Sequence, residues 1–215
     1  MRLYYHLMEL LFPRKCILCR CLLRQEETDL CDRCRLNAPA YGKHKTKLQF
    51  LDSFAAVWYY EESVRTSLLR YKFGGARSYA PAYGRLLAMR IRQDLSEEFD
   101  LLTWIPVSSL RKLRRGYDQV ELIAKAVGKE LDITPVPALK KIRHNRPQSG
   151  IRNEEARRAN VLGAYRVMDP AAVAGKRILL LDDILTTGAT ASEAARVLKT
   201  FGAREVHCAA VAARK

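Results

Sequence analysis

One apolar segment constrains the fold of this chain more than any other feature. Residues 178–181 read Ile-Leu-Leu-Leu without a polar interruption, and Asp182 and Asp183 follow at once. Such a run is typical of a strand buried on both faces, as in parallel sheets that are covered by helices. A helical pattern over residues 188–203, ending at Gly202, supplies the crossover that a parallel strand needs. The pattern predicts an α/β fold.

The rest of the chain alternates strand-like and helix-like segments in the same way. Strands are predicted over residues 52–60, 100–109, 133–142, 176–183 and 204–213, and helices over 61–73, 81–95, 116–131 and 188–203. Prolines interrupt the third of these strands, which predicts either an edge strand or a twisted one. Ligands in such sheets bind beyond the carboxyl ends of the strands, so residues 182–190 and the Pro-Val-Ser-Ser stretch at 106–109 mark candidate sites.

The N-terminal segment is rich in cysteine. Two Cys-x2-Cys pairs stand eleven residues apart, formed by Cys16, Cys19, Cys31 and Cys34. Thiolates in this spacing indicate a tetrahedral structural zinc site, and the bound metal would supply the folding energy of so short a finger. Disulfides are the alternative, which the lack of an export signal disfavours. The nearby Cys21 is interpreted as a spare thiol.

The residues between the two aspartates and the following helix suit a phosphate; they include Thr186, Thr187, Gly188, Ala189 and Thr190. Backbone N–H groups at a helix start bind anions, threonine hydroxyls add donors, and glycine allows close approach. The Walker A and dinucleotide-binding patterns are both absent. Carboxylates accept hydrogen bonds from vicinal hydroxyls, so the segment fits a ribose 5-phosphate, with Mg²⁺ assisting the two acids.

The stretch ILLLDDILTTGAT resembles the motif of type I phosphoribosyltransferases that binds 5-phosphoribosyl 1-diphosphate (PRPP). Together with the cysteine-rich finger, LLRYKFGG at 68–75, IPVSSLRKLRRGYDQ at 105–119 and RRANVLGAY at 157–165, it makes nearly the whole chain similar to the ComF (ComFC-type) late competence family. The resemblance implies a phosphoribosyltransferase-like parallel sheet flanked by helices over 41–215, preceded by a small zinc finger over 1–40.

The resemblance also implies how PRPP would bind. Its ribose and 5-phosphate would lie at the aspartate pair, which would be catalytic, and at the threonine loop. Its pyrophosphate, with Mg²⁺, would lie at residues 107–110, where Ser108 and Ser109 offer N–H groups and hydroxyls. The candidates for stabilising the leaving group are Lys72, Arg111, Arg114 and Arg115. The basic segment 143–160 is predicted to be a loop that either closes over the site or stays in solvent.

Two positions depart from the family pattern. Asp118 stands where the family usually has asparagine, which puts any hydrogen bond donated by that side chain in doubt. The Pro-Val-Ser-Ser stretch offers hydroxyls where the family typically has a histidine-containing segment, so no histidine acid or base is predicted there.

The chain is strongly basic. Its formal net charge is +15, with bases clustered at 111–116 and 140–158. Such clusters suit polyphosphates or nucleic acid, and a solvated basic face is the alternative. No stretch approaches the roughly 20 apolar residues of a membrane span. The first 13 residues fit either a docking helix or a helix that packs on its own protein.

Three functions are compatible with the sequence. The resemblance favours a PRPP-binding protein of natural transformation, a transferase for an unknown acceptor or a sensor of PRPP. It implies a cytoplasmic location, at the inner face of the membrane through partners, and a helicase-like competence protein as partner. A nucleobase-salvage phosphoribosyltransferase is the second hypothesis. It is disfavoured because residues 140–160 contain no aromatic side chain. A nonenzymatic single-stranded DNA-binding factor is the third.

Overall fold

The computed structural model describes residues 13–42, 48–95, 98–143 and 154–214. The N-terminal segment predicted as a docking or packing helix lies almost wholly outside the described residues. The described elements in chain order are α2 (Asp32–Asn37), β1 (Ser53–Tyr59), α3 (Glu62–Phe73), the 3-10 helix η1 (Arg77–Tyr79), α4 (Ala80–Asp94), β2 (Leu101–Trp104), α5 (Ser109–Arg115), α6 (Gln119–Leu131), β3 (Leu139–Lys141), α7 (Glu154–Val161), β4 (Tyr165–Val167), α8 (Pro170–Val173), β5 (Arg177–Leu185), α9 (Ala189–Thr200) and β6 (Glu205–Ala213).

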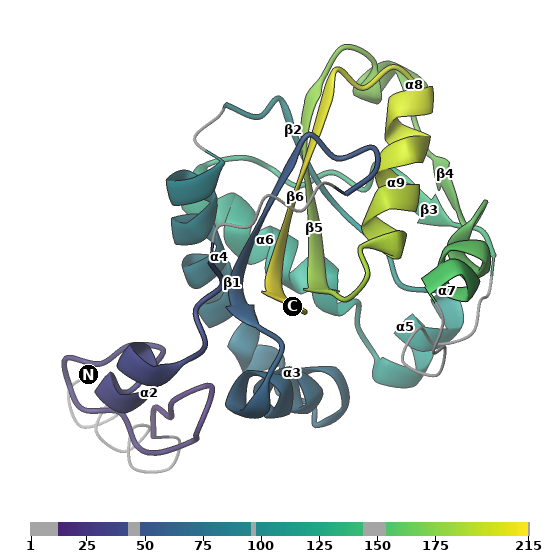
Figure 1. Ribbon diagram of the computed structural model, residues 1–215. Helices are drawn as coiled ribbons and strands as arrows, with labels where there is room; N and C mark the ends of the chain where they lie inside the picture. Colours follow the sequence, from purple (N-terminus) through teal and green to yellow (C-terminus); the bar gives the residue numbers. More distant parts are fainter. Residues whose placement is uncertain (1–12, 43–47, 96–97, 144–153, 215) are drawn as a thin grey trace.

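A parallel sheet organises the molecule. Its four strands lie in the order β1-β6-β5-β2, and every neighbouring pair is parallel. Helices α4 and α6 cover one face and α9 covers the other (Figure 1). A separate antiparallel pair, β3 with β4, packs beside α9. The predicted parallel sheet flanked by helices is what the described residues form.

The central strand β5 is buried on both faces, as its sequence predicts. Leu179 and Leu181 belong to the apolar cluster that contains the α4 and α6 side chains. Ile178 and Leu180 belong to the cluster on the α9 side. All four are fully buried, and burial of each such side chain contributes about 1.5–3 kcal/mol. Alternation along the strand therefore joins the two helical layers through one segment.

Strand β5 extends further than the sequence predicts, and β2 is shorter. The ladder between β5 and β6 continues to Leu185, two residues beyond the predicted end at Asp183, so both aspartates lie within the strand. Strand β2 ends at Trp104, and the basic run that follows Ser108 forms α5. Each strand therefore ends where its hydrogen bonds to the neighbouring strand end, and not where its residues change from apolar to polar.

Two other predictions need correction. The strand predicted over 133–142 is divided, because Pro135 bridges Leu102 of β2 whereas only Leu139–Lys141 pairs with β4. The loop predicted over 143–160 is wrong in its second part, where α7 forms and packs against α9. Residues 144–153 of that predicted loop lie outside the described residues.

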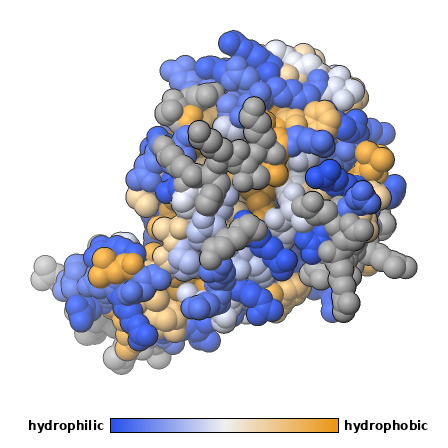
Figure 2. All heavy atoms as spheres, viewed as in Figure 1, coloured by the Kyte–Doolittle hydropathy of each residue, from blue (hydrophilic) through white to orange (hydrophobic). Residues whose placement is uncertain are grey.

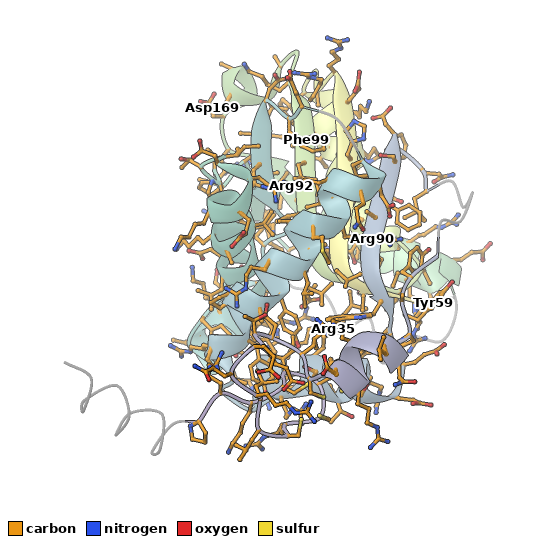
Figure 3. All side chains as sticks on the ribbon, turned by 90° about the vertical axis from the view of Figure 1, so that its left-hand side faces the viewer. Arg35, Tyr59, Arg90, Arg92, Phe99 and Asp169 are labelled. Atoms are coloured by element: carbon orange, nitrogen blue, oxygen red, sulfur yellow. The ribbon has the colours of Figure 1, made fainter. Side chains whose placement is uncertain are left out.

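The cysteine-rich segment packs on the rest of the chain beside the carboxyl ends of the strands. Ile17 and Leu18 are buried in the same cluster as the side chains of α3 and α4. The segment forms a lobe at the lower left of Figure 2, where hydrophobic and hydrophilic side chains are mixed. Figure 3 shows Arg35 of this lobe toward the same end of the sheet as Tyr59, the last residue of β1, with Phe99 toward the opposite end. The division into domains at residue 40 stays a prediction.

The close contact between α4 and α6 can be tested at Gly84. A Cβ built at Gly84 would lie 2.3 Å from the Cβ of Ala126 and 2.9 Å from its carbonyl carbon. We expect Gly84→Ala to lower the free energy of unfolding by about 1–2 kcal/mol, since overpacking outweighs the gain in helix propensity. Urea unfolding measures the change. The control Met89→Ala, at a half-exposed position of α4, should stay within about 0.5 kcal/mol of wild type.

Candidate functional site

The two aspartates lie close to the carboxyl end of β5. Since adjacent strand residues point to opposite faces, Asp183 follows Leu181 toward the α6 side and Asp182 follows Leu180 toward the α9 side. The backbone N–H of Asp183 donates to Oδ1 of Asp182 at 2.8 Å. Both residues are buried, with 8% and 9% of their surface exposed. The two carboxylates thus flank the end of one strand.

Asp183 forms an ion pair with Lys72, the penultimate residue of α3. Lys72 Nζ lies 2.8 Å from Oδ1 of Asp183, and the two side chains are 16% and 12% exposed. A buried pair of this kind is costly to break by removal of one partner, because the remaining charge is then desolvated without compensation. The structure thus brings together Lys72 and Asp183, which are 111 residues apart in sequence.

Among the residues that the structure describes, none forms an ion pair with Asp182 like the one between Lys72 and Asp183. Burial, and next the charge of Asp183, raise the pKa of Asp182 well above its usual range, while Lys72 and Lys141 act in the opposite direction. Lys141, on β3, lies 3.5 Å from the hydroxyl of Tyr165 and 5.2 Å from the centre of its ring. Burial first, and then Arg111, lower the pKa of Lys141 to about 8. The site therefore holds a second lysine on the α9 side.

Sequence reasoning missed Lys141. A usable signal was the short strand before the predicted loop, because alternation directs only one of two adjacent lysines inward. Lys140 is exposed and Lys141 half-buried, in agreement with that alternation.

The threonine loop connects β5 to α9. Gly188 caps the helix with φ of 71°, a conformation that favours glycine, and a Cβ there would lie 2.5 Å from Leu48. Gly188 and Ala189 are buried, whereas Thr186, Thr187 and Thr190 are partly exposed. The first N–H groups of a helix have no partner within the helix, so the start of this 12-residue helix can bind an anion.

The Pro-Val-Ser-Ser stretch follows β2 at the same edge. Ser108 is buried at the start of α5, and Ser109 is exposed. Oδ2 of Asp118 accepts from the backbone N–H of Val107 at 3.0 Å, and Oδ1 accepts from the N–H groups of Val120 and Glu121. Asp118 thus joins this loop to α6 and caps the helix. The aspartate at this position acts as an acceptor at both oxygens.

The predicted arginines are placed unequally. Nη1 of Arg115 donates to Gln119 at 2.7 Å, and its guanidinium lies 4.8 Å above the ring centre of Phe73. Burial lowers the pKa of Arg115, and the charge of Asp183 partly opposes that shift. Arg111 is half-buried, with its charge acting on Lys141, whereas Arg114 is exposed. The structure therefore places Arg115 near Asp183 and Arg111 near Lys141, and it leaves Arg114 at the surface.

Cavities lie near both ends of the sheet. One of about 170 Å³ opens beside the threonine loop, between Leu48, Leu162 and the first turns of α9. A larger one of about 500 Å³ lies at the amino ends, against Asp100, which directly precedes β2, and Arg177, the first residue of β5. The larger cavity is thus at the opposite end of the strands from the aspartate pair.

The four predicted cysteine ligands converge. The sulfur atoms of Cys16, Cys19, Cys31 and Cys34 all lie within 4.8 Å of one another. In a tetrahedral zinc site with Zn–S bonds of about 2.3 Å, neighbouring sulfurs are roughly 3.8 Å apart. The Cys19–Cys31 sulfur distance is 3.7 Å, so the cluster fits such an ion. The thiol of Cys21 lies near those of Cys19 and Cys31, beside the cluster and not among its four members.

Comparisons with known proteins agree with this geometry. Residues 120–215 match the family described as "Phosphoribosyl transferase domain". Competence protein F of Haemophilus influenzae is 25% identical, over 91% of this chain and 95% of that one. Competence protein ComFC of Streptococcus pneumoniae is 28% identical, over 86% of this chain and 88% of that one. The predicted resemblance to the ComF family is confirmed. The phosphoribosyltransferase-like α/β fold with an N-terminal cysteine cluster is likewise confirmed.

One further relative and one solved structure are also similar to this chain. DNA utilization protein YhgH of Escherichia coli K12 is 26% identical over 89% of this chain and 86% of that one. A solved glutamine PRPP amidotransferase from B. subtilis, complexed with ADP and GMP, has a TM-score of 0.44 and 22% identity, over 66% of this chain and 30% of that one.

Among the described residues, no helix has the length and apolar character to cross a membrane.

The dual role of Asp118 can be tested with a matched pair of variants. In Asp118→Asn the amide oxygen can still cap α6, but the amide nitrogen replaces the acceptor for Val107. We expect the free energy of unfolding to fall by about 1–3 kcal/mol, since the partly buried N–H of Val107 is left unpaired. In the control Asp169→Asn, an exposed cap that accepts only through Oδ1, stability should change little. Equal stability of both variants in urea unfolding would contradict the role of Val107.

Proposed function

We propose that this chain binds PRPP with Mg²⁺ at the carboxyl edge of its sheet. The observation that supports this most is the buried aspartate pair directly before an anion-binding helix start, with Lys72 against one carboxylate. The aspartates would accept hydrogen bonds from the ribose hydroxyls. The segment from Thr186 to Thr190 would hold the 5-phosphate through its N–H groups and hydroxyls.

The pyrophosphate would lie toward the loop after β2. Ser108 and Ser109 would donate to it, and Arg115 and Lys72 would balance its charge. Oxygen donors of the kind supplied by the aspartates and by PRPP itself are those that Mg²⁺ prefers. The ion, when bound, would neutralise pyrophosphate charge and so favour its departure. The buried residues around the site would exclude water from the ribose carbon.

As a transferase, the protein would pass the phosphoribosyl group from PRPP to an acceptor and release pyrophosphate. A protein that has kept only the ligand site would bind PRPP and release none. We propose a role in DNA uptake, since two relatives are named competence proteins and another a DNA utilization protein. A helicase-like partner is expected from the family resemblance.

Binding of single-stranded DNA is the second candidate function. One specific observation favours it: two cation–aromatic pairs lie near α5, and the ring of one of them, Phe73, is exposed while that of Tyr117 is buried. Arg115 lies above Phe73, whose surface is 68% exposed, and Arg77 lies 4.4 Å from the ring centre of Tyr117. Bases of single strands stack on exposed aromatic rings while nearby cations bind the backbone.

The PRPP assignment is tested by calorimetric titration of PRPP and Mg²⁺ into the zinc-loaded protein. We expect binding by the wild type and at least a tenfold loss, about 1.4 kcal/mol, in Asp183→Asn, which loses a charged acceptor for ribose. Circular dichroism establishes that the variant is folded.

Unchanged affinity in Asp183→Asn would overturn the ribose assignment. Absence of binding by the wild type would overturn the proposed function. A salt-dependent affinity for DNA that ignores Asp183→Asn would then support the second candidate.

We propose that the cysteine cluster holds one structural Zn²⁺. Elemental analysis should give one zinc per chain in the wild type and in Cys21→Ser, because Cys21 lies beside the cluster and is not among its four ligands. In Cys19→Ser a tetrahedral ligand is lost, and we expect zinc to be depleted. Cys19 and Cys21 are both exposed, which makes the pair a matched comparison. Zinc loss from Cys21→Ser would contradict this ligand set and indicate that Cys21 is a zinc ligand.

A further inference from the structure

Helix α3 contacts the cysteine cluster through two polar side chains. The hydroxyl of Ser67 donates to the carbonyl oxygen of Ile17 at 2.5 Å. Nη2 of Arg70 donates to the same oxygen at 3.1 Å and also to the carbonyl oxygen of Leu18. Ile17 and Leu18 are the two residues between Cys16 and Cys19. The helix therefore holds the backbone of the first metal-binding turn.

The same helix reaches the aspartate site one turn further along. Lys72 forms the ion pair with Asp183, and the ring of Phe73 lies below the guanidinium of Arg115. The hydroxyl of Tyr71 donates to the backbone oxygen of Gln119 at 2.8 Å. Three consecutive residues thus fix the end of α3 against the site.

The connection between these two sets of contacts is short and buried. Ser67 and Lys72 are five residues apart, which is about 7.5 Å along a helix. Ser67, Leu68 and Tyr71 are fully buried, and the Ser67 hydroxyl also lies 2.7 Å from that of Tyr83. Close-packed interiors transmit displacement, so a shift of the metal-binding turn will move Lys72 relative to Asp183.

We propose that metal binding at the cysteine cluster and ligand binding at the aspartate site are coupled through α3. Ser67 and Arg70 are the positioning residues, and Lys72 is the group whose placement they control. The proposal rests on the PRPP site argued above and on the fit of the four sulfurs to zinc.

The physical basis is the fixed geometry of a metal-bound turn. Coordination by Cys16 and Cys19 fixes the carbonyl groups of Ile17 and Leu18 and so gives Ser67 and Arg70 oriented acceptors. Without the metal, thiols impose no such geometry, and the acceptors lose their orientation. Nη2 of Arg70 makes the hydrogen bonds of this guanidinium to the turn. Nε of the same side chain is buried without a hydrogen-bond partner among the described residues.

Coupling of this kind is reciprocal. If zinc raises the affinity for PRPP by some factor, PRPP raises the affinity for zinc by the same factor. We expect a factor of about ten, within the range usual for coupled sites. Two independent measurements therefore report one quantity, and neither depends on turnover.

The first measurement compares PRPP affinity, with Mg²⁺, between the full zinc-loaded chain and the same chain stripped by a chelator. The second follows zinc transfer from the loaded chain to a chromogenic chelator, with and without PRPP. Each is made on wild type, on Arg70→Ala and on the control Arg85→Ala. Arg85, on α4, also holds the cluster segment, through Asp29 at 2.5 Å and 2.9 Å, but makes no contact through α3.

For wild type and Arg85→Ala we expect about tenfold weaker PRPP binding without zinc and slower zinc transfer with PRPP. Two ratios should approach one in Arg70→Ala, even where absolute affinities fall. They are the PRPP affinity with zinc over that without zinc, and the zinc-transfer rate without PRPP over that with PRPP. Equal PRPP affinity with and without zinc in the wild type would overturn the coupling. Failure of the loaded wild type to bind PRPP would instead overturn the PRPP site.

If the stripped chain unfolds, the ratio of zinc-transfer rates with and without PRPP alone decides. A ratio of one in the wild type overturns the coupling, and equal ratios in the two variants overturn the role of α3.

Discussion

Two carboxylates buried near the end of one strand are the constraint on which the carboxyl edge of the sheet depends. Desolvation disfavours their charged forms, and the rise in the pKa of Asp182 is the result. The chain compensates with cations from separate elements: Lys72 from α3 on one face, and Lys141 from β3 on the other. Because each lysine has to reach a fixed point, the positions of α3 and of the β3–β4 pair are tied to the end of β5.

The parts of this arrangement that the sequence predicts are local. An uninterrupted apolar run such as that of β5 is typical of a strand that is buried on both faces of a helix-covered sheet. Glycine after two threonines, before a helical pattern, predicts the turn that Gly188 makes. Cys-x2-Cys spacing brings two sulfurs together within each turn, and the convergence of both pairs follows from their proximity in the chain. The ligand set, the strand and the loop were predicted for these reasons.

Contacts between distant segments could not be predicted in this way. Nothing local to Arg70 indicates that its guanidinium meets a turn 52 residues earlier. In the sequence, Lys141 is one of several bases in a basic segment, and only the pairing of β3 with β4 gives its side chain a direction. Asp118 departs from the family pattern in sequence, and only the structure shows that its two oxygens join a loop to a helix. In each case the missing information was the partner, which only the folded chain supplies.

The ion pair at Asp183 also bears on which ligands the site can accept. A neutral sugar would offer hydroxyls to Asp183 while Lys72 stays paired with the same carboxylate, so the charge of Lys72 would attract no part of that ligand. A free phosphate would be attracted by Lys72 but repelled by the carboxylate beside it. A sugar that carries both hydroxyls and a pyrophosphate satisfies both partners at once. The buried pair is therefore one reason why we propose a ligand of PRPP's mixed chemistry for this site.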